Sequence, residues 1–141
     1  MNNSSTVCID ANIVIQRVVS NAAENLWETW AQTGVKLVAP TLLFYEVTNG
    51  LYRYQKAGIF PPETVEKTLK AAFALPIELV SDVDLHHRAK DLAAKYNLPA
   101  AYDAHYLALA EQLDVELWTA DARLFNTVQS FGVDWVKLVE K

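Results

Sequence analysis

Short apolar runs of strand length alternate along this chain with longer segments of helical period. Five such runs lie at 6–10, 35–40, 77–80, 115–120 and 134–139. Between them, apolar residues recur every three or four positions, a spacing typical of helices that bury one face. Strands that alternate with helices favour a parallel sheet, because the chain must cross back over the sheet before each new strand. The sequence therefore predicts an α/β fold with a mainly parallel central sheet covered by helices on both faces.

Turn and cap residues place the helices between these strands. A helix is expected at 21–33, with Asn21 as its N-cap and Gly34 as its stop. A long helix is expected from Thr41 to Gly58, and Ser81 or Asp82 begins another at 83–95. Further helices are expected directly after the first strand, from Pro61, at 101–113 and at 121–131. Together they leave no linker or repeat, and a single domain spanning 1–141 is expected.

The helix expected at 101–113 carries two tyrosines, Tyr102 and Tyr106, and both are placed on or near its buried side. Its apolar residues Leu109, Ala110 and Leu113 fall on the same side. This helix is therefore expected to pack firmly against the sheet.

Composition narrows the class of protein. Hydrophobic residues make up 52% of the chain, which excludes a disordered or fibrous protein. Cys8, the single cysteine, lies in an apolar run and is expected to be a buried hydrophobe without a disulfide. The N-terminus does not resemble a signal peptide, and no stretch reaches the ~18 apolar residues of a membrane span. A cytoplasmic protein that does not enter the membrane is expected.

Four acidic residues occupy positions that packing alone does not explain. Asp10 and Asp121 end strand-like runs, Asp103 follows a stretch also expected to be strand-like, and Glu46 interrupts an apolar helix. Because the carboxyl ends of parallel strands share one edge, Asp10 and Asp121 are expected at the same edge of the sheet. Oxygen ligands without a His or Cys cluster suit Mg²⁺ or Mn²⁺. The set predicts a site for hard cations, which serves phosphodiester cleavage.

Each acid also has an ordinary structural explanation. Asp is a favoured N-cap, so Asp10, Asp103 and Asp121 could each begin a helix. Glu46 could be a solvated residue beside Asn49 and Arg53 on the same helix. Capping does not explain why several acids share one edge, whereas a bound cation would neutralise their mutual repulsion. For any one acid taken alone, both explanations stay open.

Charge and missing motifs limit the other functions. The net charge of −5 argues against binding nucleic acid by bulk electrostatics, although a bound cation can reverse the local field of an acidic nuclease. His86 and His87 are expected to be solvated, and His105 is expected to face away from Asp103. The sequence lacks the glycine-rich nucleotide loops, the GxSxG elbow and any CxxC pair. Dinucleotide, P-loop, serine-hydrolase and zinc sites are therefore disfavoured.

Four strings of the sequence resemble the PIN-domain nucleases, particularly the VapC-type toxins of toxin–antitoxin pairs. They are IDANIVI, then Pro40-Thr41 followed by LLFYEVTNGL, then YDAHYLALA, then TADARLF. The family's acidic quartet falls on the four acids named above, with Thr119 as the hydroxyl residue two positions before the last of them. Many relatives have Thr or Ser two residues after the first Asp, whereas this chain has Asn12, which can hydrogen-bond a metal-bound water.

This resemblance implies a three-layer PIN-like sandwich that hydrolyses RNA internally, using one or two Mg²⁺ or Mn²⁺ ions held by the four acids. It also implies a small antitoxin partner and a homodimer. Four basic residues are candidates for phosphate contacts, each with an ordinary surface role as the alternative: Arg17, Arg53, Lys56 and Arg123.

Two other functions remain compatible with the resemblance. One is a PIN-type nuclease that acts in RNA processing or on structured DNA. The other is a non-catalytic interaction module that keeps the fold, against which the four intact acids argue.

Overall fold

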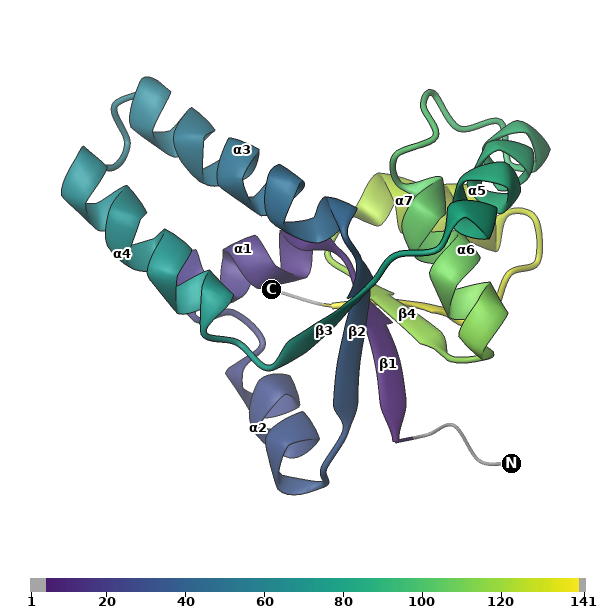
Figure 1. The fold of residues 1–141 in the computed structure, drawn as a ribbon, viewed down its shortest axis with the longest axis horizontal. Coiled ribbons are helices and arrows are strands. Elements are labelled where there is room, and N and C mark those ends of the chain that lie inside the picture. The colour runs from purple at the N-terminus through teal and green to yellow at the C-terminus, as the bar shows by residue number, and fades with distance from the viewer. Residues whose placement is uncertain (1–4, 140–141) are drawn as a thin grey trace.

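The computed structural model describes residues 5–139, which form five strands and seven helices (Figure 1). In chain order these elements are β1 (Thr6–Ile9), α1 (Ala11–Ser20), α2 (Glu24–Gln32), β2 (Lys36–Pro40), α3 (Leu42–Lys56), α4 (Pro62–Phe73), β3 (Ile77–Val80), α5 (Val83–Lys95), α6 (Ala104–Leu113), β4 (Glu116–Thr119), α7 (Ala122–Gln129) and β5 (Val136–Leu138). The predicted α/β class is confirmed.

The five strands form one sheet in the order β3-β2-β1-β4-β5, and every neighbouring pair is parallel. The chain builds outward from β1 to β3 and then crosses back to build β4 and β5 on the other side of β1. The strand order therefore reverses between β1 and β4. Parallel α/β sheets form their sites at such a reversal, beyond the carboxyl ends of the strands. Asp10 follows β1 directly, and Asp121 follows β4 after one residue, Ala120.

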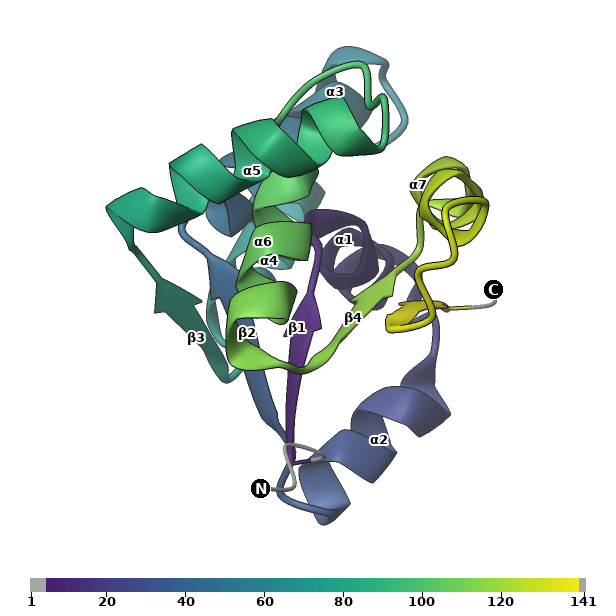
Figure 2. The same ribbon diagram turned by 90° about the vertical axis from the view of Figure 1, so that its right-hand side faces the viewer.

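Helices cover the sheet on both faces, which gives the three layers. Figure 1 shows α1, α3 and α4 on one side of the strands, and α5, α6 and α7 on the other. Figure 2 shows α6 crossing the sheet beneath α5, in agreement with contacts of α6 to β1, β2 and β4. Crossovers between parallel strands are right-handed, so reversing the strand order moves the connecting helices to the opposite face.

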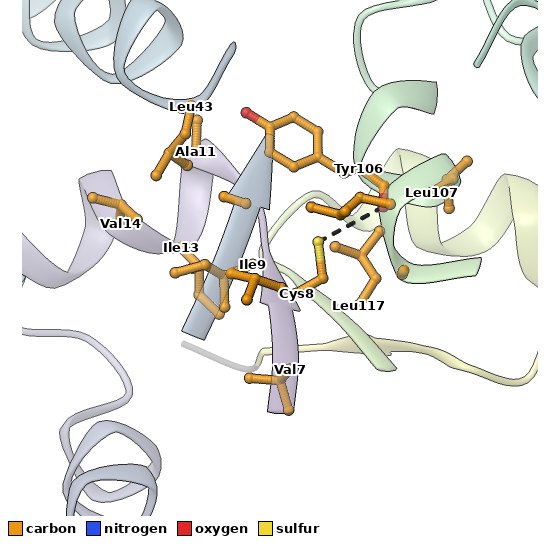
Figure 3. Packing of buried hydrophobic residues seen from close by; sticks show 14 of the residues in the cluster. Val7, Cys8, Ile9, Ala11, Ile13, Val14, Leu43, Tyr106, Leu107 and Leu117 are labelled. Carbon is orange, nitrogen blue, oxygen red and sulfur yellow. Dashed lines mark hydrogen bonds between the residues drawn. The ribbon is translucent and has the colours of Figure 1, made fainter. Parts of the chain in front are cut away.

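The central strand β1 is buried on both faces. Figure 3 shows Cys8 on the side of Tyr106 and Leu117, while Ile9 points towards Ile13 of α1. The thiol of Cys8 lies 3.7 Å from the backbone oxygen of Tyr106, and burial raises the pKa of this thiol far above its ordinary value. The prediction of a buried cysteine is confirmed. A strand held from both faces fixes the position of the residue that follows it, Asp10.

The predicted N-cap of the second helix is wrong. Asn21 adopts the left-handed conformation with φ of 55° and ends α1, where its N–H donates to the carbonyl of Arg17. Asparagine tolerates this conformation, and the same residue type therefore serves helix ends as well as helix starts. α2 begins three residues later, at Glu24.

The stretch before Asp103 is also not a strand. Asn97, with φ of 52°, ends the turn that follows α5, and the chain reaches α6 through bends and turns. Tyr102 lies in this connection rather than in the helix and is 65% exposed, so its predicted burial is wrong. None of the helices within residues 5–139 is long and apolar enough to cross a bilayer.

Candidate active site

A cavity of about 190 Å³ opens at the carboxyl edge of the sheet, between α1, α3 and α6. Asp10, Glu46 and Asp103 line it, together with Asn12. Asp121 is near enough that its charge raises the pKa of both Asp10 and Asp103. The structure thus brings together the four acids that the sequence singled out.

One hydroxyl joins the ends of β1 and β4. Thr119, fully buried, donates a hydrogen bond to Oδ2 of Asp10 and accepts one of 3.0 Å from the backbone N–H of Asp121. The other oxygen of Asp10 accepts from the N–H of Ile13, at 3.3 Å. The carboxylate of Asp10 is therefore fixed by the sheet and by the first turn of α1.

Burial dominates the electrostatics of these acids. Asp10 is only 4% exposed, and its burial raises the pKa to about 7 against the lowering effect of the hydrogen bonds from Thr119 and Ile13. Burial, and then Asp121, raise the pKa of Asp103. Burial also raises the pKa of Glu46. The hydrogen bond from Tyr106 and the nearby His105 act in the opposite direction and lower this pKa. Without a cation, the fold resists full ionisation of the site.

Tyr106 connects the two helical layers across the cavity. Its ring is buried, and its phenol oxygen donates a 2.5 Å hydrogen bond to Oε1 of Glu46. Figure 3 shows the ring extending from α6 towards the start of α3. In the sequence, Tyr106 was expected only to pack on the buried side of its helix. The sequence held one indication of a further role: the phenol oxygen is a polar atom on a helix face expected to be apolar, and a buried polar atom needs a hydrogen-bond partner.

Gly50 allows α1 and α3 to lie close together beside the cavity. A Cβ atom at this position would stand 2.5 Å from Cδ1 of Ile15 on α1. Asn49, Gly50 and Arg53 all line the cavity, so the stripe of α3 beside Glu46 faces the site rather than open solvent.

The capping explanation holds for two of the three aspartates. Asp10 caps α1, and Asp121 caps α7 by accepting from the N–H groups of Arg123 and Leu124 at 3.0 and 3.2 Å. Both bonds at Asp121 use Oδ1, which leaves Oδ2 for another partner. Asp103 stands at the cap position of α6, yet its side chain accepts no capping hydrogen bond from the described residues. Capping alone therefore does not account for Asp103.

The basic candidates separate by position. Arg53 lines the cavity, whereas Arg17 bonds to Asn21 at the far end of α1 and lies over the ring of Trp27. Arg123 is exposed in the first turn of α7, and Lys56 is exposed in the last turn of α3. Arg53 is the basic residue best placed for a phosphate at the cavity.

His86, which was expected to be solvated, forms a pair with His105. Nδ1 of His86 lies 2.9 Å from Nε2 of His105, and Nδ1 of His105 lies 2.8 Å from the carbonyl oxygen of Ala101. The sequence could not show this contact, because it depends on how α5 packs on α6.

The oxygen-only lining has the chemistry that Mg²⁺ and Mn²⁺ prefer. Within residues 5–139, however, no group of three or more His, Cys, Asp or Glu side chains is arranged to hold an ion by itself. Mg²⁺ keeps several of its waters and is commonly bound through one or two carboxylates. The donor types at this cavity fit such a hydrated ion, held by Asp10 and its acidic neighbours.

Comparison with known proteins agrees with this geometry. The family model described as PIN domain matches residues 7–129. The chain belongs to the PIN-domain family. All four acids and Thr119 lie inside the matched region, so the resemblance seen in the sequence is confirmed.

Relatives of the PIN-domain chain include two mycobacterial proteins. VapC ribonuclease Mb0985 of Mycobacterium bovis and ribonuclease VapC9 of Mycobacterium tuberculosis are each 33% identical to it over 95 residues, which cover 67% of this chain and 72% of theirs. A toxin–antitoxin complex from Klebsiella pneumoniae contains a chain that matches with a TM-score of 0.69 at 21% identity, covering 96% of this chain and 98% of that one. PAE2754 from Pyrobaculum aerophilum matches with a TM-score of 0.68 at 22% identity, covering 86% and 85%. These two structures share the fold.

The raised pKa of Asp10 predicts how stability depends on pH when no metal is bound. The folded state holds the proton more tightly than the unfolded chain, so stability is highest below about pH 4 for this group and is lost as pH rises to about 7. In a chelator, the free energy of unfolding should fall by roughly 4 kcal/mol across this window through Asp10 alone. Urea titrations at pH 5 and pH 8 should show roughly 3 kcal/mol of this loss, because part of it already occurs between pH 4 and pH 5. Asp10→Asn, which keeps an acceptor oxygen, should remove most of this pH dependence of the free energy of unfolding. The same pH dependence in both proteins would contradict the assignment.

Proposed function

We propose that this PIN-domain protein is a metal-dependent endoribonuclease and the toxin of a toxin–antitoxin pair. The observation that carries the proposal is the buried carboxylate of Asp10 at the reversal of the strand order, which shares one cavity with Glu46 and Asp103 and feels the charge of Asp121. The mycobacterial relatives that bear the name ribonuclease support RNA as the substrate. A cytoplasmic location, where RNA is made and translated, is part of the same proposal.

In this proposal the acids have different duties. Asp10, Asp103 and Asp121 would hold the cation, and Glu46 would hold it or orient a water bound to it. When bound, Mg²⁺ or Mn²⁺ supplies a water of lowered pKa and neutralises charge that develops on the phosphate.

The neighbouring side chains orient the acids. Both oxygens of Asp10 are held in place, because Thr119 donates to one and the backbone N–H of Ile13 donates to the other. The phenol of Tyr106 occupies Oε1 of Glu46 and so directs Oε2 to other partners. Arg53 would contact a phosphate at the mouth of the cavity, and Asn12 would hydrogen-bond a metal-bound water. Geometry and charge are the protein's contribution.

The proposed antitoxin would inhibit by occupying this cavity. An acidic cavity that resists ionisation favours a positive side chain as much as a cation. An Arg or Lys of the partner placed there would compete with metal. The match to a chain of a toxin–antitoxin complex supports such a partner.

Metal binding should stabilise the folded protein. A cation that binds only the native state adds about 2.7 kcal/mol when its concentration is one hundred times its dissociation constant. Melting temperatures at pH 8 should therefore rise with Mn²⁺ or Mg²⁺ and fall again with a chelator, and Asp10→Asn should remove most of the response. A melting temperature indifferent to saturating Mn²⁺ would count against the site.

Asp103→Asn tests the chemical role of the acid that does not cap its helix. The variant keeps the shape of the side chain and removes one charge, so folding should survive and stability at pH 8 should rise through relief of repulsion. RNA cleavage should fall at least about a hundredfold, because even outer partners of metal ligands contribute 10–100-fold. Total RNA, structured RNA and flap DNA, incubated with Mg²⁺ or Mn²⁺ beside Asp10→Ala, form the assay panel.

The outcome of this panel separates the candidate functions. Cleavage of single-stranded or loop RNA supports the toxin-like ribonuclease, and cleavage confined to flap DNA supports a DNA-processing nuclease. Metal binding without cleavage of any substrate would leave the cation site and defeat the ribonuclease proposal.

A homodimer is the second assembly we propose. An apolar groove between α3 and β3 is lined by Phe44, Tyr52 and Leu79, and Phe44 stacks on the half-exposed Phe73 of α4. β3 is an edge strand, and exposed apolar surface beside such an edge favours association. Two copies related by a two-fold axis would cover Phe44, Tyr52 and Leu79 and would leave Tyr45, which lines both this groove and the neighbouring cavity, at the margin of the contact.

Light scattering at micromolar concentration should report a dimer of this chain. Phe73→Asp should shift it to a monomer, because a carboxylate would have to be buried in the contact. Phe131→Asp is the matched control, since Phe131 is also about half exposed but lies beyond the end of α7. A monomeric wild type would exclude the dimer.

A further inference from the structure

A second cavity, of about 330 Å³, adjoins the acidic one at the carboxyl ends of β2 and β3. Its lining includes Tyr45 of α3, Tyr102 before α6, and the His86–His105 pair. Each of three lining residues is the immediate neighbour of a residue of the acidic cavity: Tyr45 precedes Glu46, Tyr102 precedes Asp103 and His105 precedes Tyr106. The two cavities are therefore two sides of one surface.

The tyrosines are unusually exposed for such large rings. Tyr45 of α3 is 77% exposed, and Tyr102, in the connection before α6, is 65% exposed. Neither ring is among the stacked aromatic pairs of the described residues. Exposed aromatic rings beside a phosphate site are the platforms on which proteins stack unpaired bases.

Hydrogen bonding fixes what the histidine pair offers. The carbonyl of Ala101 can only accept, so Nδ1 of His105 carries a proton. In the neutral ring Nε2 of His105 is then an acceptor, and Nδ1 of His86 must be the donor to it. Nε2 of His86 is left as an acceptor. The carboxylate of Asp82 and the hydroxyl of Ser81 also line the cavity, so its polar side is rich in acceptors.

We infer that this cavity holds one unpaired base of the RNA substrate, stacked on Tyr45 and Tyr102, and that it selects a base with an exocyclic amino group. The volume lies in the range of small-ligand sites. Acceptors at His86 and Asp82 match the amino groups of adenine, cytosine or guanine, whereas uracil has no amino group and offers only its ring N–H. The inference rests on the proposed function, since the phosphate next to this base would lie at Asp10 and Asp103.

Fluorescence of 2-aminopurine within a short uridine-rich RNA measures stacking without requiring cleavage. The oligonucleotide is titrated with the full chain in Ca²⁺, which takes the same oxygen ligands. Binding should quench the fluorophore, and the double variant Tyr45→Ala/Tyr102→Ala should abolish quenching and weaken binding at least tenfold. Phe131→Ala is the control, because it removes a half-exposed ring that lines neither cavity. Circular dichroism melts of all variants confirm folding.

A second comparison tests the acceptor side. Replacing a single adenine in the oligonucleotide by purine, which lacks the amino group, should weaken binding about two- to tenfold in the wild type. It should have no effect in the double variant.

The results separate this inference from the proposed function. Quenching that survives in the double variant, a wild type that binds no RNA, or a double variant that is monomeric where the wild type is dimeric would each overturn the base site. If the double variant loses quenching but the wild type cuts no RNA with Mg²⁺ or Mn²⁺, the base site is supported and the nuclease proposal is defeated. If the wild type cuts RNA but the double variant quenches as the wild type does, the nuclease proposal is supported and the base site is overturned.

Discussion

The burial of one carboxylate, that of Asp10, is the constraint on which the site depends. An ionised carboxylate removed from water is costly unless it is hydrogen-bonded and paired with a positive charge. Thr119 and Ile13 provide hydrogen bonds but no charge, and burial still raises the pKa to about 7. The fold therefore holds an acid whose electrostatic requirements only a cation or a proton can meet. A purely structural cap would not need such burial, since caps work equally well at the surface.

Capping and ligation are compatible at the same residue, because a carboxylate has two oxygens and about four acceptor sites. Oδ1 of Asp121 accepts hydrogen bonds from the N-terminus of α7, and Oδ2 is left for another partner. Its backbone is in turn held by Thr119, whose side chain also holds Asp10. The hydrogen bonds that begin the helices thus set the orientation of the acids. This arrangement explains why each aspartate, taken alone in the sequence, left both interpretations open.

Much of the fold could be predicted because it depends on local periodicity. The five strands were recognisable as short apolar runs, and the parallel sheet places Asp10 and Asp121 at one edge whatever the loops do. Features that depend on tertiary packing or on a single backbone angle were missed. Asn21 ends a helix because its φ is positive, and no side-chain pattern distinguishes that from an N-cap. The pairing of His86 with His105 requires α5 to lie on α6, and the exposure of Tyr102 follows from where α6 begins.

The four acids differ in what supports them, and this difference bears on how a cation would be held. Asp10 and Asp121 follow adjacent parallel strands, so the sheet fixes their separation. Glu46 belongs to α3 on one face of the sheet, and Asp103 belongs to the start of α6 on the other. The distance between Glu46 and Asp103 therefore varies with the spacing of the two helical layers, while that between Asp10 and Asp121 does not. The hydrogen bond from Tyr106 to Glu46 ties these layers together at the cavity. A cation or a partner's positive side chain that draws Glu46 and Asp103 inward would act on the layer spacing, so occupancy of the site and the packing of α3 and α6 are physically linked.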